Sequence, residues 1–301
     1  MEKINFSHSL IFFNFCIFIS PFYLLLNFEP IIFCLVLILI LGISHGALDN
    51  VKGKKLLRLF GYKSSFSFYL TYIIISLLII FFWLLFPNTV LLLFLIVASY
   101  HFGKEDTVFS FKRKFLIPEC LYFFKGSAVI LAPLLFQRDK TSEIFQTLNF
   151  NVFESQIFTN HFLIALLCLS FLSSLFISNK KSYDLKGLMI MDFFSLIILN
   201  IFLTPVLAFT IYFCFLHSIR HSITLIFELD KSFNLGFKKF INRAIPLTFV
   251  TGVIFLIAVY FLSSFYKVDE AIYKVIFIGL ASLTFPHILL EYLLEKNEKR
   301  T

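Results

Sequence analysis

The chain has 301 residues, of which 59% are hydrophobic and only 15% are charged, and its mean hydropathy is +0.90. This composition excludes an ordinary water-soluble globular protein and is typical of an integral membrane protein. The formal net charge of +8 does not indicate a nucleic-acid partner, because the basic residues lie in short stretches between apolar runs and form no basic domain.

Ten apolar stretches of roughly bilayer length follow one another along the chain, each close to the ~20 residues that a helix needs to cross. They cover residues 9–27, 31–49, 67–86, 89–103, 118–136, 161–178, 187–203, 206–227, 245–265 and 271–293. The first run lacks a cleavage site of small residues, so we interpret it as a retained span. The fourth run is short, which leaves a tilted or partial span open. We therefore predict an all-α polytopic membrane protein with about ten transmembrane helices in one bundle, forming a single domain over residues 1–301.

Basic residues are distributed unequally between the two sides of these spans. Only Arg138, Lys140 and Lys267 lie in loops on one side. The other side holds Lys3, Lys52, Lys54, Lys55, Arg58, Lys63, Lys104, Lys112, Arg113, Lys114, Lys180, Lys181, Lys186, Lys231, Lys238, Lys239, Arg243, Lys296, Lys299 and Arg300. The positive-inside rule then predicts a multi-pass protein of the cell (inner) membrane with both termini in the cytoplasm.

Five of the seven histidines fall in the inner halves of spans that run in the same direction. They are His45, His101, His217, His221 and His287. At 1.5 Å per residue they lie roughly 16–24 Å from the outer ends of their helices, which places them in one slab of the cytoplasmic leaflet. His8, before the first span, and His161, at the outer start of the sixth, are interpreted as bystanders.

The spacing of His217 and His221, i and i+4, places two imidazoles on one helical face, as a metal pair requires. Ionisable groups inside membrane spans are costly and usually mark function. We therefore favour a metal site over structural hydrogen bonding for the five histidines. Imidazole binds zinc, copper, nickel or iron, so these ligands alone do not identify the metal.

Acidic residues follow three of the histidines by about one helical turn. They are Asp49 after His45, Asp106 after His101, and Glu291 after His287. A carboxylate in that position can accept the distal ring N–H of a ligand histidine and fix its tautomer, although ordinary charges at helix ends are an equally open interpretation. We expect Arg220 to pair with one of these acids, because a lone arginine at that depth is expensive.

Four segments that carry these histidines resemble, in order, motifs of the Brp/Blh family of bacterial and archaeal β-carotene 15,15′-dioxygenases. They are Gly42-Ile-Ser-His-Gly-Ala-Leu-Asp49, His101-Phe-Gly-Lys-Glu-Asp106, Tyr212-Phe-Cys-Phe-Leu-His-Ser-Ile-Arg-His221 and Phe285-Pro-His-Ile-Leu-Leu-Glu291. The resemblance runs from about residue 31 to 293. Ser44 stands where the family commonly has proline, which affects the backbone and leaves the expected ligands unchanged.

The resemblance implies O₂-dependent cleavage of the central double bond of β-carotene to two retinal molecules, at a non-haem Fe(II) held by His45, His101, His217 and His221. His287 is then expected to act from outside the ligand set, hydrogen-bonded to Glu291. Membrane lipid would deliver the substrate, and retinal could pass to a rhodopsin. Tyr100 and Tyr212 are candidate walls of a carotenoid tunnel, with ordinary packing as the alternative for both.

Two other functions remain open at this point. A di-iron membrane desaturase or hydroxylase needs at least eight histidines in clusters, and this chain has seven. A metal or proton transporter needs a polar path across the whole membrane, whereas the outer halves of the spans that carry the histidines consist almost entirely of Ile, Leu, Phe and Val.

Overall fold

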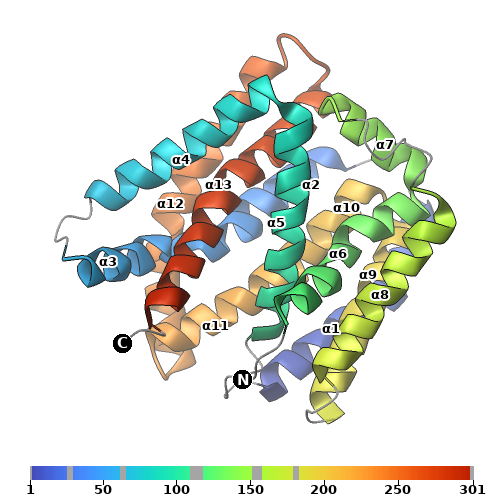
Figure 1. Ribbon diagram of the computed structural model, residues 1–301, viewed down its shortest axis with the longest axis horizontal. Helices are drawn as coiled ribbons and strands as arrows, with labels where there is room; N and C mark the ends of the chain where they lie inside the picture. Colours follow the sequence, from blue (N-terminus) through green and yellow to red (C-terminus); the bar gives the residue numbers. More distant parts are fainter. Residues whose placement is uncertain are drawn as a thin grey trace. The chain divides into compact units, whose positions relative to one another are not determined.

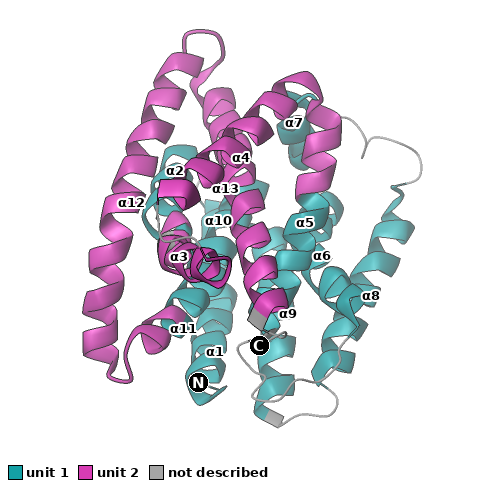
Figure 2. Cartoon of the chain, turned by 60° about the vertical axis from the view of Figure 1, so that its left-hand side comes forward, with its two compact units in different colours: residues 1–42, 95–224 teal, residues 43–94, 225–301 magenta. Residues whose placement is uncertain are grey.

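The computed structural model describes residues 2–25, 30–61, 66–108, 118–150, 158–178 and 183–298, which are almost entirely helical and include no strand. The all-α prediction is confirmed. The chain divides into two compact units (Figure 2), unit 1 with residues 1–42 and 95–224, and unit 2 with residues 43–94 and 225–301. Each unit combines two separate stretches of sequence. The single-domain prediction is not tested by this division and stays a prediction.

Unit 1 contains the N-terminal helices and the central part of the chain (Figure 1). Its elements are α1 (Glu2–Ile19), the 3₁₀ helix η1 (Ser20–Leu25), α2 (Ile31–Leu37), the π-helix η2 (Ile38–Gly42), most of α5 (Pro87–Val108), α6 (Glu119–Phe136), α7 (Arg138–Thr147), α8 (Asn160–Ser178), α9 (Tyr183–Phe202), α10 (Pro205–Ile211), the π-helix η5 (Tyr212–Ser218) and the start of α11 (Ile219–Leu229). Within it, α1 packs against α9, and α6 packs against α8 and α9.

Two glycines bring α5 and α6 into backbone contact. A Cβ atom on Gly103 would lie 1.8 Å from the carbonyl oxygen of Tyr122, and one on Gly126 would lie 1.9 Å from that of Ser99. Only glycine fits at both positions, and such small-residue contacts let membrane helices approach closely. The crossing fixes the last two turns of α5, which carry His101 and the acids that follow it.

Two π-helical segments, η2 and η5, interrupt the regular helices of unit 1 and pack against each other. A Cβ atom on Gly42 of η2 would lie 2.5 Å from the ring of Phe213 in η5, so a larger residue would displace that ring. π-Helical turns are rare and occur frequently at functional sites. Here η5 carries His217.

Unit 2 contains the 3₁₀ helix η3 (Ile43–Leu48), α3 (Asp49–Leu59), α4 (Phe66–Leu85), the first turns of α5, the end of α11, α12 (Phe233–Leu262) and α13 (Val268–Glu298). Helix α13 packs against α3, α4 and α12, and η3 packs against α12. Large hydrophobic side chains along α4 and α12 are exposed, for example Phe81, Ile254 and Tyr260. Apolar surfaces of this kind are typical of membrane-spanning helices.

Eight helices in the described parts of the chain are long and apolar enough to cross a membrane. They correspond to eight of the ten expected spans. The expected span over residues 31–49 is instead divided among α2, η2 and η3, and only the short stretch Ile31–Gly42 forms an apolar helix. The expected span over residues 89–103 lies in α5, whose last turns are charged because they hold Lys104, Glu105 and Asp106.

Candidate metal centre

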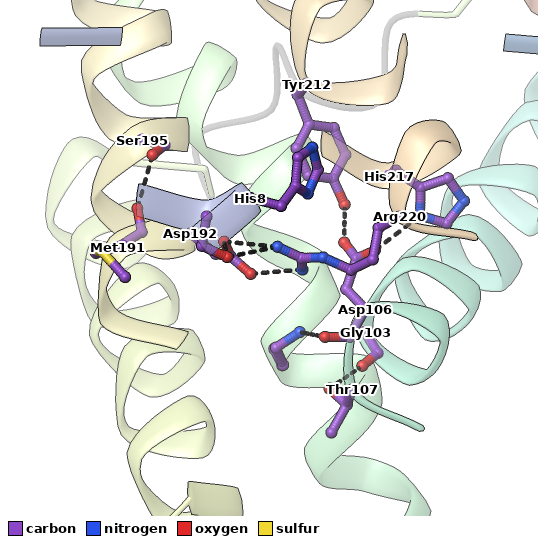
Figure 3. Close-up of polar contacts among 12 residues, drawn as sticks. His8, Gly103, Asp106, Thr107, Met191, Asp192, Ser195, Tyr212, His217 and Arg220 are labelled. Atoms are coloured by element: carbon purple, nitrogen blue, oxygen red, sulfur yellow. Dashed lines mark hydrogen bonds and ion pairs between the residues drawn. The ribbon is translucent and has the colours of Figure 1, made fainter. Parts of the chain in front are cut away.

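The imidazole of His217 is held by a carboxylate of α5. Its Nδ1 atom lies 2.9 Å from Oδ1 of Asp106, and Oδ2 of Asp106 accepts a hydrogen bond of 2.6 Å from the hydroxyl of Tyr212 (Figure 3). An ionised carboxylate can only accept, so Nδ1 carries the ring proton and the lone pair is on Nε2. His217 is only 1% exposed. The ring is therefore set in the tautomer and orientation of a metal ligand that coordinates through Nε2.

His221 has the same arrangement with the neighbouring acid. Its Nδ1 atom lies 2.9 Å from Oε2 of Glu105. The buried Nε2 atoms of His217 and His221 receive no hydrogen bond from the described residues. Two consecutive acids at the end of α5 thus orient two histidines that are one turn apart on η5 and α11.

His101 lies on α5, one turn before Glu105, and is buried. Its ring centre is 5.3 Å from that of His217, with 68° between the ring planes. With metal–nitrogen bonds of about 2.1 Å, two imidazoles on neighbouring positions of one ion have ring centres about 4.5–5.5 Å apart. The separation of His101 and His217 therefore fits shared coordination.

Aromatic rings surround His217. The ring of Phe102 is edge-on at 4.9 Å between centres, and that of Phe213 is stacked at 5.8 Å. Such walls exclude water and suit an apolar, conjugated ligand. Of the two tyrosines expected as wall residues, Tyr212 directs its hydroxyl to Asp106, and Tyr100 hydrogen-bonds through its hydroxyl with Glu119 and Lys104.

Arg220, between the two histidines, pairs with an acid that the sequence analysis did not single out. Its guanidinium donates to both carboxylate oxygens of Asp192 on α9, at 2.6 and 3.0 Å, and to Oγ of Ser9 on α1 at 2.7 Å. The prediction that Arg220 pairs with Asp49, Asp106 or Glu291 is wrong. The acid in the middle of an apolar run, Asp192, was a signal that sequence reasoning could have used.

His8 lies inside α1 rather than before the first span, so that part of the interpretation is wrong. Its Nε2 atom is 2.8 Å from the carbonyl oxygen of Phe215 in η5, and Figure 3 shows it beside Arg220. Nearby, a cavity of about 40 Å³ is lined by Asp106, Lys125, Asp192 and Tyr212 together with apolar residues. A polar cavity of this size has room for a bound water.

Unit 2 holds a third histidine with a carboxylate partner. Nδ1 of His287 lies 2.9 Å from both oxygens of Asp49, and the hydroxyl of Tyr72 donates to Oδ2 of Asp49 at 3.0 Å. Glu291 instead forms an ion pair with Lys52. The expected hydrogen bond between His287 and Glu291 is therefore replaced by one to Asp49.

Possible ligand atoms of Asp49, His287 and Glu291 lie within 4.8 Å of one another. The Lys52 ammonium already compensates the charge of Glu291, and Asp49 is hydrogen-bonded to Nδ1 of His287, so we do not assign a metal to this group. His45 lies in η3, and its side chain is outside the part of the chain that the structure describes.

Acids therefore orient three of the five histidines singled out in the sequence, but in pairings that the local spacing did not indicate. Asp106 contacts His217 on η5, Asp49 contacts His287 on α13, and Glu105, which contacts His221, had not been singled out. These contacts join separate helices, and only tertiary structure reveals them.

Comparison with known proteins adds an independent finding. The sequence profile of the family described as "Beta-carotene 15,15'-dioxygenase" matches residues 36–295. A curated protein named "Beta-carotene 15,15'-dioxygenase", from uncultured marine bacterium 66A03, is 29% identical over 278 residues, which cover 88% of this chain and 94% of that relative. No solved structure shows significant similarity to the chain.

Proposed function

Because the chain belongs to the β-carotene 15,15′-dioxygenase family, we propose that it cleaves the central 15,15′ double bond of β-carotene with O₂, forming two molecules of all-trans-retinal at a non-haem Fe(II) centre. The observation that carries this proposal is the family match over residues 36–295, a range that includes all five of the histidines expected in the inner leaflet. The match disfavours the transporter and the di-iron desaturase as alternatives.

The side chains of unit 1 support an iron site. His101, His217 and His221 offer neutral nitrogen ligands, and Asp106 and Glu105 place the ring protons of two of them on Nδ1. Their two negative charges also offset part of the charge of a divalent ion. His45 joins the ligand set on the family resemblance alone. When bound, Fe(II) with nitrogen ligands and open positions would supply the redox chemistry that O₂ needs to react with a polyene.

The overall reaction adds one oxygen atom to each half of the carotenoid and neither consumes nor releases a proton. The chain therefore needs no general acid or base for the overall balance, and its residues can act by orientation and exclusion of water. Asp106, fixed by Tyr212, orients His217. Phe102 and Phe213 provide dry, apolar contact beside that imidazole.

β-Carotene is a rigid apolar rod that dissolves in the bilayer, so we propose that it enters the protein from lipid. We also propose that the length of a tunnel in the protein places the central double bond of the carotenoid at the metal. The many exposed apolar side chains support this route, since such surfaces are suited to contact with acyl chains. In this proposal, the retinal product leaves through the lipid and is then available to a rhodopsin. In this proposal the enzyme resides in the cell membrane with both termini in the cytoplasm.

The test is expression in bacteria that accumulate β-carotene, with retinal measured by chromatography and the loss of orange colour measured in extracts. We expect retinal from the wild-type protein and none from His217→Ala. The matched control is His161→Ala, which removes an exposed histidine at the start of α8 and should leave retinal formation unchanged. Wild-type protein that accumulates in the membrane with bound iron and leaves the carotene intact would refute the proposed reaction.

A further inference from the structure

Unit 2 contains a cavity of about 500 Å³ that is separate from every histidine described above. It lies between α3 and α12, whose positions in unit 2 are labelled in Figure 1. Its lining residues are Asn50, Val51, Lys54, Lys55, Arg58, Leu59 and Arg243. A cavity of this size is in the range of pockets that hold small molecules and cofactors.

Most of the lining residues come from one face of α3, while another face packs against the protein. Residues 50, 54 and 58 and residues 51, 55 and 59 form two adjacent i+4 rows on one side of the helix. Other positions of α3 face the protein, where Gly53 closely approaches the ring of Phe68 and Lys52 pairs with Glu291. The basic face of α3 is therefore turned toward the cavity while another face is anchored in unit 2.

The charge of the cavity is of one sign. Four of the seven lining residues are cations, three from α3 and Arg243 from α12, and the described lining includes no acid. Lysine and arginine brought together from two helices attract an anion, and arginine is suited to bind phosphate oxygens in pairs. The cavity therefore favours an anionic ligand, and a phosphate group matches its lysine and arginine side chains.

The apolar residues beside these cations favour a lipid over a soluble anion as the ligand. Val51 and Leu59 of α3 and Phe60, the residue after it, are 37%, 46% and 58% exposed. A helix with apolar residues beside lysine and arginine, placed between apolar membrane segments, is typical of the membrane interface. Basic pockets between membrane helices on the cytoplasmic side bind anionic headgroups, and the expected topology places α3 on that side.

We propose that this cavity is a binding site for an anionic glycerophospholipid such as phosphatidylglycerol, with the phosphate between Lys54, Arg58 and Arg243 and the acyl chains along Val51 and Leu59. Binding would join α3 to α12. Asp49, the first residue of α3, hydrogen-bonds His287, so a lipid that stabilises α3 also stabilises that contact.

Native mass spectrometry of the detergent-purified full-length protein tests the site, with phosphatidylglycerol and phosphatidylcholine titrated separately. We expect selective binding of phosphatidylglycerol to the wild type and roughly 10-fold or greater weakening in the Lys54→Gln/Arg58→Gln variant, since each cation near an anionic headgroup contributes severalfold in affinity. The matched control, Lys231→Gln/Lys238→Gln, removes the same charge from exposed positions and should bind phosphatidylglycerol as the wild type does.

A second measurement distinguishes a lipid from a free anion. Phosphatidylglycerol should raise the unfolding temperature of the wild type, and inorganic phosphate at millimolar concentration should not. The Arg243→Gln variant should lose most of this stabilisation. Equal stabilisation by inorganic phosphate, or equal phosphatidylglycerol affinity in the Lys54→Gln/Arg58→Gln and control variants, would overturn the proposal.

Discussion

Replacing Asp106 with alanine tests whether the carboxylates of α5 prepare the histidines for metal. The substitution removes the acceptor for Nδ1 of His217, at 2.9 Å, and for the hydroxyl of Tyr212, at 2.6 Å. Loss of such an outer partner typically weakens metal binding about 10–100-fold, which corresponds to about 1.4–2.7 kcal/mol. We expect the dissociation constant for Fe(II) to rise within that range, because the imidazole then loses both its fixed tautomer and its orientation.

The assay is anaerobic titration of the iron-free protein with Fe(II) against a competing chelator, alongside the initial rate of retinal formation. Tyr212→Phe is the matched control, since it removes the hydroxyl that holds Asp106 and keeps the contact between Asp106 and His217. Its effect on iron affinity should be less than about 10-fold. If Asp106→Ala binds Fe(II) as tightly as the wild type while folding normally, the carboxylate does not prepare His217 for metal and the reasoning fails.

Three further predictions follow from the same site and topology. Alanine at His45, His101, His217 or His221 should abolish retinal formation and lower the iron content, measured by elemental analysis; full activity in any variant removes that residue from the ligand set. His287→Ala should keep nearly one iron per chain while turnover falls, because a fifth histidine ligand would leave at most one open position in an octahedral site; iron loss equal to that of His217→Ala would make His287 a ligand. Reporters fused after Lys55 and Lys239 should read cytoplasmic and one after Lys140 external; opposite signals would reverse the topology.

The positions of most membrane helices were predictable because their apolar composition directly reflects the lipid surroundings. The ends of these helices were less predictable. Helix α12 begins at Phe233 and α13 continues to Glu298, since charged turns can extend a helix beyond the bilayer core without a change in apolar content. Helix α7 was not expected, because Arg138–Thr147 is polar. The interrupted segment through η2 and η3 reads as one apolar run, and apolar content alone does not indicate the close contact of Gly42 with Phe213.

The histidines were visible from the sequence because ionisable residues stand out in apolar spans, but the partners of His217 and His287 were not. The convergence of all five histidines stays a prediction. Spacing of i+4 shows only that two side chains share a face of one helix. In the structure, His217 and His287 contact acids on other helices. The close helix crossings within unit 1 bring Asp106 to His217, and the packing of α13 on α3 brings Asp49 to His287. Helix spacing therefore singled out Asp49 and Asp106, but not the histidines, His287 and His217, whose Nδ1 atoms they contact.

The pair formed by Arg220 and Asp192 supplies the last prediction, since it fixes the turn that separates His217 from His221. Arg220 is 1% exposed and Asp192 is 9% exposed, so Asp192→Ala leaves a buried cation without its carboxylate and should cost about 3–5 kcal/mol of stability. We expect both the unfolding temperature and the iron content to fall.

The double variant Asp192→Leu/Arg220→Met removes both charges and should recover most of the stability, because apolar replacement of a buried pair is often neutral or favourable. Iron content separates two roles of the pair. If the pair only supports folding, iron returns together with the unfolding temperature. We expect iron to return only in part, because the guanidinium also bonds Ser9 and so ties the histidine-bearing turn to α1 as well as to α9. An unchanged unfolding temperature in Asp192→Ala would contradict this account, since a buried arginine that loses its bidentate carboxylate partner should destabilise the fold.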